Sequence, residues 1–136
     1  MSTFHPGGCA CGAVRYEIAA EPLFTLNCHC RDCQRETGSA YAPVIGVARS
    51  AFTVTRGEPR TWGVTGGSGK TVLRAFCGDC GSSLYGVPEV APDLVTVRAG
   101  SLDDPSLFRP ARDIFTTRAQ PWDHMDPSLP KFPELA

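Results

Sequence analysis

The run Gly8-Cys9-Ala10-Cys11-Gly12-Ala13-Val14-Arg15-Tyr16-Glu17-Ile18 places two closely spaced cysteines directly before a strand. Its last five residues, 14–18, alternate apolar and charged side chains, and this period of two is typical of a strand with one buried face. Runs rich in β-branched or aromatic residues recur at 41–47, 52–56, 71–76, 83–87, 94–99 and 114–117. The sequence therefore predicts a mainly β protein.

One short helix is predicted immediately after the middle group of cysteines. Residues 31–37 are rich in charged and polar side chains, and Gly38 is suited to a left-handed C-terminal stop. The segment 118–136 contains too many prolines for regular structure, so we expect it to pack over the surface of a single domain formed by residues 1–136, with Trp122 as an anchor.

Composition limits the classes of partner. The chain has 136 residues, of which 42% are hydrophobic, and Lys+Arg 13 against Asp+Glu 14 give a formal net charge of -1. This balance gives no electrostatic reason to expect nucleic acid or an anionic membrane as the main partner. The sequence shows no apolar run of membrane-spanning length and no signal peptide, so a cytoplasmic location and a small-molecule substrate are expected.

Seven cysteines are unusual for a chain of this length. In a reducing cytosol such a concentration of thiols indicates metal binding or catalysis, because disulfides do not persist there, and an odd number cannot pair completely. The cysteines form three groups, which are Cys9 and Cys11; Cys28, Cys30 and Cys33; and Cys77 and Cys80. Each group has the spacing of metal ligands.

The first and last groups are expected to share one zinc ion. A Cys-x-x-Cys knuckle such as Cys77 to Cys80 turns the backbone sharply, so that both sulfurs reach one ion, and Gly81 suits the end of that turn. Together with Cys9 and Cys11 the knuckle would complete a closed tetrahedral site that stabilises the fold and performs no chemistry.

The middle group, Cys28, Cys30 and Cys33, supplies three thiolates and leaves a zinc ion one ligand short, as catalytic zinc sites do. Two alternatives stay open. A histidine could close the site as a fourth ligand, and the candidates are His29, His5 and His124. The spacing of Cys30 and Cys33 is also that of a thiol-redox pair, although such pairs usually occur in βαβ units, which this sequence lacks.

Three neighbours of these cysteines are candidates for supporting roles. His29 stands between two ligands whose side chains would both face the metal, so its own ring should project away, toward a pocket or behind the ligands. Arg31 and Arg35 could offset the negative charge of the thiolates or hold a thiol substrate.

The glycine-rich segment 65–70 is a poor match to a phosphate-binding loop and is expected to be a hairpin loop. Trp62 and Phe76 are expected in the core.

The order of these motifs resembles the glutathione-dependent formaldehyde-activating enzyme family, which also includes centromere protein V-like proteins. The matching segments are Gly8-Cys9-Ala10-Cys11-Gly12-Ala13-Val14-Arg15-Tyr16, Cys28-His29-Cys30-Arg31-Asp32-Cys33-Gln34-Arg35, Thr37-Gly38-Ser39, Phe76-Cys77-Gly78-Asp79-Cys80-Gly81-Ser82, Arg118-Ala119-Gln120-Pro121-Trp122 and Leu129-Pro130-Lys131-Phe132. The resemblance spans nearly the whole chain. Relatives often carry a histidine where this chain has Asp113, so that histidine's role does not transfer.

The resemblance implies several coiled antiparallel sheets built around two zinc ions per chain, one structural and one catalytic, with the ligand sets reached above from spacing. It implies carbon-sulfur lyase or synthase chemistry, in which glutathione or another thiol combines with an aldehyde to give adducts such as S-hydroxymethylglutathione. A thiol taking the open position would be activated because the cation lowers its pKa. The alternatives are a non-catalytic zinc-stabilised binding module and a zinc or redox sensor.

Overall fold

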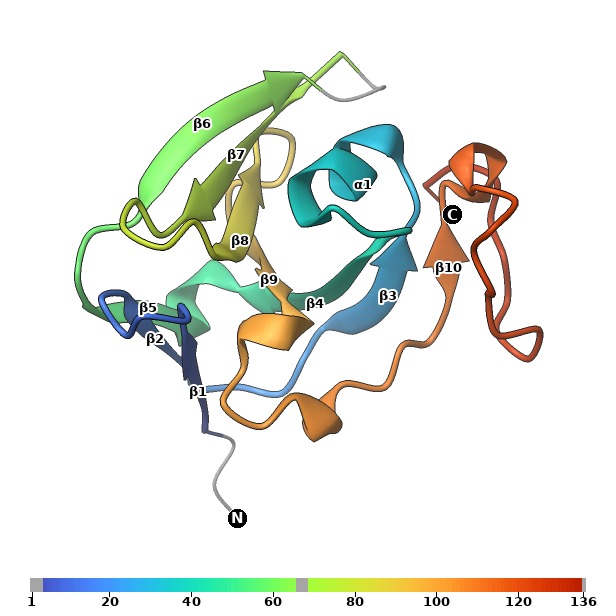
Figure 1. Cartoon of the computed structure of the whole chain (residues 1–136). Helices are drawn as coiled ribbons and strands as arrows, with labels where there is room; N and C mark the ends of the chain where they lie inside the picture. The colour runs from blue at the N-terminus through green and yellow to red at the C-terminus, as the bar shows by residue number, and fades with distance from the viewer. Residues whose placement is uncertain (1–3, 66–68, 136) are drawn as a thin grey trace.

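Strands dominate the described part of the chain, residues 4–65 and 69–135 of a computed structural model (Figure 1), and the mainly β prediction is confirmed. The strands are β1 (His5–Gly8), β2 (Arg15–Ile18), β3 (Phe24–Cys28), β4 (Ala42–Ala48), β5 (Phe52–Arg56), β6 (Arg60–Thr65), β7 (Thr71–Phe76), β8 (Ser83–Pro88), β9 (Leu94–Arg98) and β10 (Asp113–Ile114). The helix α1 (Arg31–Thr37) ends at Gly38, whose φ of 68° is left-handed, as predicted. Short 3-10 turns lie at η1 (Arg49–Ala51), η2 (Ala99–Ser101), η3 (Pro105–Leu107) and η4 (Thr116–Arg118).

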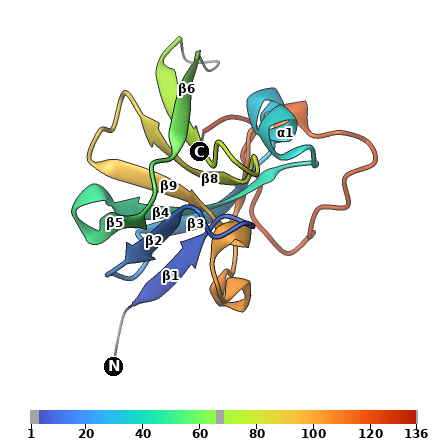
Figure 2. The same ribbon diagram turned by 60° about the vertical axis from the view of Figure 1, so that its left-hand side comes forward.

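The strands form two sheets of unequal size. A three-stranded sheet has the order β1-β2-β5, and a seven-stranded sheet has the order β10-β3-β4-β9-β8-β7-β6. The pairs are antiparallel, as expected, except that β10 lies parallel to β3. Figure 2 shows the smaller sheet beside the larger one. None of the helices in the described ranges has the length and hydropathy that crossing a bilayer requires.

Three strands are absent from the sequence-based prediction. β1 contains a proline and two glycines and reads as a loop, yet it pairs along its whole length with β2. β3 mixes polar and apolar residues, and β6 is mostly exposed. The predicted strand 114–117 is wrong beyond Ile114, because Phe115 adopts a left-handed φ of 55° and the chain turns into η4. Whether each of these segments forms a strand depends on pairing with segments distant in sequence, which the local pattern does not record.

The two sheets enclose the main core. Tyr16 and Ile18 of β2 are fully buried against the inward side chains of β4, β8 and β9. The rings of Tyr16 and Phe52 stack at 5.2 Å, and Phe52 packs on Tyr85 at 4.6 Å. The sequence period of two in 14–18 therefore has the expected cause, which is one buried face per strand.

A second core lies on the other face of the large sheet, below α1. Leu26 and Cys28 of β3 pack there with Cys33 of the helix and with Phe132 of the C-terminal segment. That segment follows the sheet edge, since Asp113 donates its backbone N–H to Pro130 and accepts one from Phe132.

Two tryptophans differ from expectation. Trp122 is 61% exposed, so the prediction that it anchors the tail is wrong. The tail residue that packs against the second core is Phe132. Trp62 is 54% exposed and is not a core residue. Phe76 is partly buried. The loop predicted at 65–70 joins the antiparallel strands β6 and β7, although residues 66–68 lie outside the described ranges.

Gly57, between β5 and β6, supports a stability prediction. Its φ is +77°, and a Cβ atom there would lie 2.1 Å from the carbonyl oxygen of Ala13. Gly69 has a similar φ of +81° with nothing near the Cβ position. We expect Gly69→Ala to lower the free energy of unfolding by about 1 kcal/mol and Gly57→Ala by roughly 2 kcal/mol or more, because only the latter adds a backbone clash. Denaturant unfolding measures both, and equal losses would contradict the role of the clash.

Candidate metal and thiol sites

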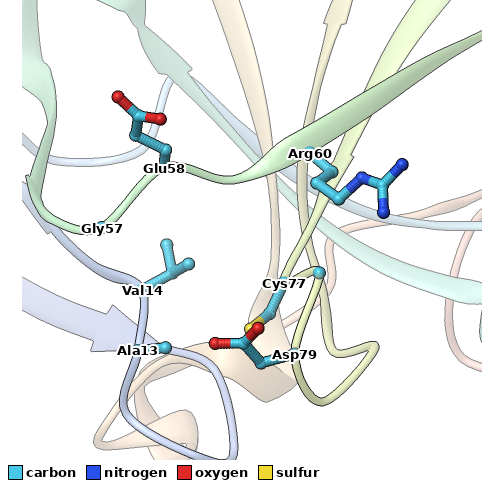
Figure 3. A pocket seen from close by; sticks show the side chains of 8 residues that line it. Ala13, Val14, Gly57, Glu58, Arg60, Cys77 and Asp79 are labelled. Atoms are coloured by element: carbon cyan, nitrogen blue, oxygen red, sulfur yellow. The ribbon is translucent and has the colours of Figure 1, made fainter.

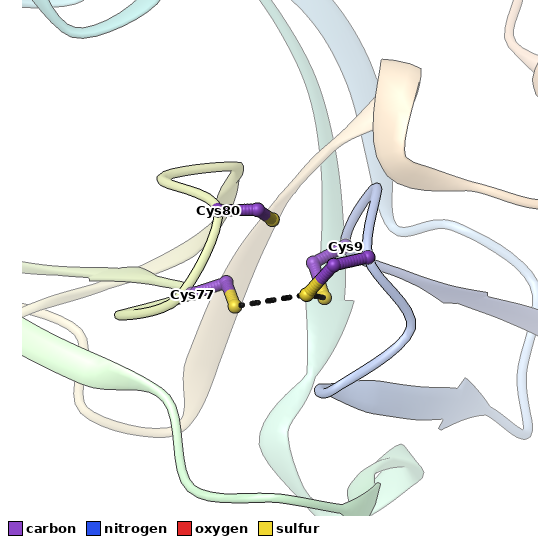
Figure 4. A group of neighbouring side chains, drawn as sticks. Cys9, Cys77 and Cys80 are labelled. Atoms are coloured by element: carbon purple, nitrogen blue, oxygen red, sulfur yellow. Dashed lines mark hydrogen bonds between the residues drawn. The ribbon is translucent and has the colours of Figure 1, made fainter.

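The four outer cysteines converge on one point. Cys9 and Cys77 are buried, Cys11 and Cys80 are exposed, and the four sulfurs all lie within 4.8 Å of one another. The Sγ of Cys11 lies 3.6 Å from that of Cys9 and 3.8 Å from that of Cys77. Thiolates at the corners of a tetrahedron around zinc, about 2.3 Å from the ion, stand about 3.8 Å apart, so the residues fit this metal. Figure 4 shows the sulfurs of Cys9, Cys77 and Cys80 turned toward one another.

Two tight turns bring these sulfurs together. In the second turn, Gly81 has φ 81° and donates its N–H to the carbonyl of Cys77 at 2.8 Å. In the first turn, the N–H of Val14 donates to Cys9 Sγ at 3.2 Å. Hydrogen bonds from the side chain and backbone of Ser82 lower the pKa of the Cys80 thiol to about 5. The surroundings of Cys80 therefore favour its thiolate form, whereas the neighbouring cysteines raise the pKa of the Cys11 thiol to about 12.

The three middle cysteines form a second convergent group. Cys28 ends β3, Cys30 is the N-cap of α1 and Cys33 lies in its first turn, and their sulfurs all lie within 4.8 Å of one another. The backbone N–H of Cys33 donates to Cys30 Sγ at 3.3 Å, so the thiol itself caps the helix. Within 4–65 and 69–135, no histidine or carboxylate joins this group. The donor set fits a zinc ion held by three protein sulfurs.

Arg74 supplies positive charge at this group. It is a buried residue of β7, and its two terminal nitrogens lie 3.8 and 3.9 Å from Cys33 Sγ. Hydrogen bonds from Cys28 and Cys33 lower the pKa of the Cys30 thiol to about 2, and the charge of Arg74 acts in the same direction. The neighbouring sulfurs and burial raise the pKa of the Cys28 and Cys33 thiols, so Cys30 is the thiol of this group that most readily carries negative charge, with a buried cation beside the group.

A chain of ion pairs holds Arg74 in place. Glu36 of α1 accepts from Arg74 at 3.0 Å and from Arg98 of β9 at 2.6 Å. Burial raises the pKa of Glu36, but its bonds to the two arginines outweigh burial, so the pKa is lowered. The carboxylate and the two guanidinium groups together carry a net positive charge next to the thiols. Helix α1 is thereby tied to the sheet on the same face as Cys33.

The role of the two arginines near the middle cysteines in sequence, Arg31 and Arg35, stays a prediction. Arg31 and Arg35 are exposed on α1, and Arg31 donates to the side chain of Gln34. Arg74 is not predicted from the sequence, because a single charged residue in a strand is typical of an exposed face. A signal exists in the spacing, since Glu36 follows Cys33 by one helical turn and so shares its face.

His29 follows the last residue of β3 and is not among the convergent metal-binding side chains; it pairs with two carboxylates instead. It is buried, with Nε2 2.8 Å from Asp113 Oδ1 and Nδ1 2.8 Å from Asp123 Oδ2. Its ring also contacts that of Tyr41 at 5.2 Å. Lys131 Nζ binds the other oxygen of Asp113 at 3.1 Å. Asp113 is thus an anionic partner of His29.

Trp62 and Arg74 are directly opposite each other in the β6–β7 pair. Residues opposite each other in an antiparallel pair project to the same face, so the half-exposed indole stands on the face of the sheet that carries the three-cysteine group. Trp62, which was expected in the core, therefore presents an exposed aromatic ring near Arg74.

A separate hollow of about 300 Å³ lies beside the four-cysteine cluster (Figure 3). Its walls include Cys77, Glu58, Arg60 and Asp79, and none of residues 28–33. Its three charged side chains are exposed and of mixed sign, and they give it no evident chemistry.

Comparisons with known proteins agree with this architecture. Residues 4–118 match the model of the family described as "Glutathione-dependent formaldehyde-activating enzyme". A crystal structure of a Rhodobacter sphaeroides protein superposes with a TM-score of 0.59 at 21% sequence identity, covering 93% of this chain and 98% of that chain. At this identity the superposition shows a shared fold.

Proposed function

Because the chain belongs to the glutathione-dependent formaldehyde-activating enzyme family, we propose that it is a zinc-dependent carbon-sulfur lyase or synthase acting on thiol-aldehyde adducts such as S-hydroxymethylglutathione. The observation that carries this proposal is the group of Cys28, Cys30 and Cys33, three convergent thiols with no fourth protein donor in the described ranges. A buried arginine beside them adds a place for an anionic sulfur.

The two cysteine groups would hold two ions with different roles. Cys9, Cys11, Cys77 and Cys80 would close a structural site, whereas Cys28, Cys30 and Cys33 would hold a catalytic ion. Zinc at the second site would supply a positive charge that lowers the pKa of a thiol substrate and keeps it nucleophilic at neutral pH. Three protein thiolates give that site an excess of negative charge, which the protein must offset.

The reaction is an addition without redox change. The sulfur of glutathione or another thiol bonds to the carbonyl carbon of formaldehyde, the carbonyl π bond breaks, and the thiol proton ends on the new hydroxyl oxygen. The reverse direction breaks the carbon-sulfur bond. We assign the stabilisation of the anionic sulfur to Arg74 rather than to Arg31 or Arg35, because the guanidinium of Arg74 is buried within 3.9 Å of Cys33 Sγ, whereas Arg31 and Arg35 are exposed.

His29 is proposed as a positioning residue. Its backbone N–H donates to Ile114 at 3.0 Å, and its carbonyl accepts from Gln34 at 2.8 Å. Its ring is held by Asp113 and Asp123. These contacts hold the backbone between Cys28 and Cys30, the two proposed ligands on either side of His29. Contacts to residues beside metal ligands orient the ligands themselves.

Zinc stoichiometry combined with X-ray absorption at the zinc edge tests the proposal. Purified protein is measured with and without glutathione, and the exchange between glutathione, formaldehyde and S-hydroxymethylglutathione is followed by NMR, since the uncatalysed addition also proceeds. We expect two ions, one of which gains a sulfur ligand from glutathione, and faster exchange than in buffer. Two ions fully ligated by protein and indifferent to thiols would indicate a zinc-stabilised binding module. Reversible zinc release by mild oxidant, without turnover, would indicate a sensor.

Arg74→Met is expected to raise the KM for the thiol substrate about tenfold or more, because a buried charge that stabilises an anionic sulfur is lost. It should also lower the free energy of unfolding by about 3 kcal/mol, since Glu36 loses one partner of a buried ion pair. Arg31→Ala and Arg35→Ala are the matched controls. If either control raises KM as strongly as Arg74→Met, the assignment to Arg74 is wrong.

A further inference from the structure

A row of directly paired residues crosses one face of the large sheet and ends in an exposed aromatic ring. The row consists of Gly46 of β4, Thr96 of β9, Gly86 of β8, Arg74 of β7 and Trp62 of β6. Residues paired in this way project to the same face of a sheet. Trp62 therefore stands beside Arg74 on the edge strand β6 (Figure 1).

Trp62 presents its indole to solvent. The residue is 54% exposed, and among the described residues its ring stacks on no other aromatic ring. Val64 and Val72, which pair with each other two positions farther along the hairpin, are half-buried on the same face. The three side chains form an apolar strip next to Arg74. Covering such a strip removes apolar surface from water, so it favours the apolar or planar part of a bound molecule.

Arg74 connects this strip to the three-cysteine group. Its guanidinium lies within 3.9 Å of Cys33 Sγ and pairs with Glu36 at 3.0 Å. The Cα atoms of directly opposed residues in an antiparallel pair are about 4.5–5.5 Å apart, so the base of the Trp62 side chain lies one strand spacing beyond that of Arg74. A molecule that extends from the cysteines toward β6 meets Arg74 first and the indole next.

This arrangement sets the size of the molecule that can use both contacts. The path from Cys33 to Trp62 covers the Arg74 side chain and one strand spacing. An extended tripeptide spans about 10 Å, so we expect a thiol with a body of that size to reach the indole. A thiol with a two-carbon body is expected to end beside Arg74.

From these observations we infer that Trp62 is a binding residue that selects thiols with a peptide-sized body, the sulfur lying at the three-cysteine group and an amide plane of the body packing on the indole. Amide planes and hydrocarbon both pack well on the face of an aromatic ring. The inference rests on the proposed function, because it places the non-reacting part of the thiol substrate of that reaction. Contacts to a non-reacting part of a substrate decide which substrates are used efficiently.

Kinetics with two thiols test this role. Trp62→Ala is expected to raise the KM for glutathione about tenfold and to leave the KM for 2-mercaptoethanol within about twofold, because only the longer thiol reaches the indole. Trp62→Tyr keeps an aromatic face and should recover most of the loss. Leu73→Ala is the matched control, since Leu73 is 48% exposed and projects to the opposite face of the same strand pair. Equal changes for both thiols, or an equal effect of Leu73→Ala, would overturn the inference.

Fluorescence separates this inference from the proposed function. The chain has two tryptophans, so Trp122→Phe leaves Trp62 as the one indole. The full-length variant is titrated with S-methylglutathione, which has the peptide body but no free thiol. We expect a saturable change in emission, and none in Trp62→Phe, whose remaining indole is Trp122.

The two measurements give distinguishable outcomes. A saturable emission change without thiol exchange by the wild type would support the contact at Trp62 and refute the proposed reaction. Thiol exchange by the wild type, with no emission change and an unaltered KM in Trp62→Ala, would refute the role of Trp62 and leave the proposed function standing. The absence of both signals would refute both.

Discussion

Cys77→Ser is expected to abolish cooperative folding at 37 °C. Cys77 is fully buried, belongs to the main core and contributes one of four convergent sulfurs. A structural zinc ion supplies roughly 10–16 kcal/mol of apparent binding free energy, comparable with or larger than the whole stability of a typical domain, about 5–15 kcal/mol. The four-cysteine cluster joins the turn before β2 to the turn after β7, so its loss separates the two sheets at that end.

Circular dichroism and thermal unfolding measure this effect, and zinc analysis accompanies them. Wild-type protein should show a melting temperature that rises with free zinc, because an ion that binds only the folded chain stabilises it by mass action. Cys77→Ser should lack a cooperative transition at any zinc concentration used. A variant that melts within a few degrees of the wild type would show that the cluster is not a folding determinant.

Cys30→Ser is expected to abolish catalysis while leaving the chain folded. Cys30 is only partly buried and caps a seven-residue helix, and a serine hydroxyl is itself a good N-cap. The middle group would keep two thiols, too few to hold zinc tightly, so zinc content should fall from two ions to one. Exchange of S-hydroxymethylglutathione should then drop to the uncatalysed rate.

The two cysteine variants serve as controls for each other. Both remove one sulfur from a convergent group, but only Cys77→Ser removes a sulfur from the cluster assigned to folding. Zinc stoichiometry, thermal unfolding and thiol exchange are measured on both. If Cys30→Ser retains two ions and full exchange, the middle group is not the catalytic site, and the carbon-sulfur lyase proposal fails with it.

The cysteine spacing predicted both convergent groups without reference to the fold. Pairs separated by one or two residues can present two sulfurs on one side of a turn, and this is a local property of the chain. The period of two likewise predicted most strands, since alternation records which side chains a strand buries. The C-terminal end of α1 was also predictable from local sequence, because Gly38 readily adopts the left-handed conformation that ends the helix.

Partners from distant strands were not predictable in this way. Arg74 reaches Cys33 only because β7 belongs to the same sheet as β3, and Glu36 then bridges it to Arg98. Nothing in the spacing of an isolated arginine indicates such a contact. Arg31 and Arg35 are close to the cysteines in sequence, and the helix nevertheless turns both toward solvent.

The sequence by itself determined the mainly β class, the helix α1 and the grouping of the cysteines into two pairs and one triplet, because each depends on residues that lie within a few positions of one another. The fold then brings the two distant pairs, Cys9 with Cys11 and Cys77 with Cys80, into one cluster. Only the tertiary structure decided which charges stand beside those sulfurs, which face of β3 carries the thiols, and how His29 comes to lie between Asp113 and Asp123. These features depend on sheet order and on the path of the tail, and both are set by burial and pairing between segments far apart in the chain.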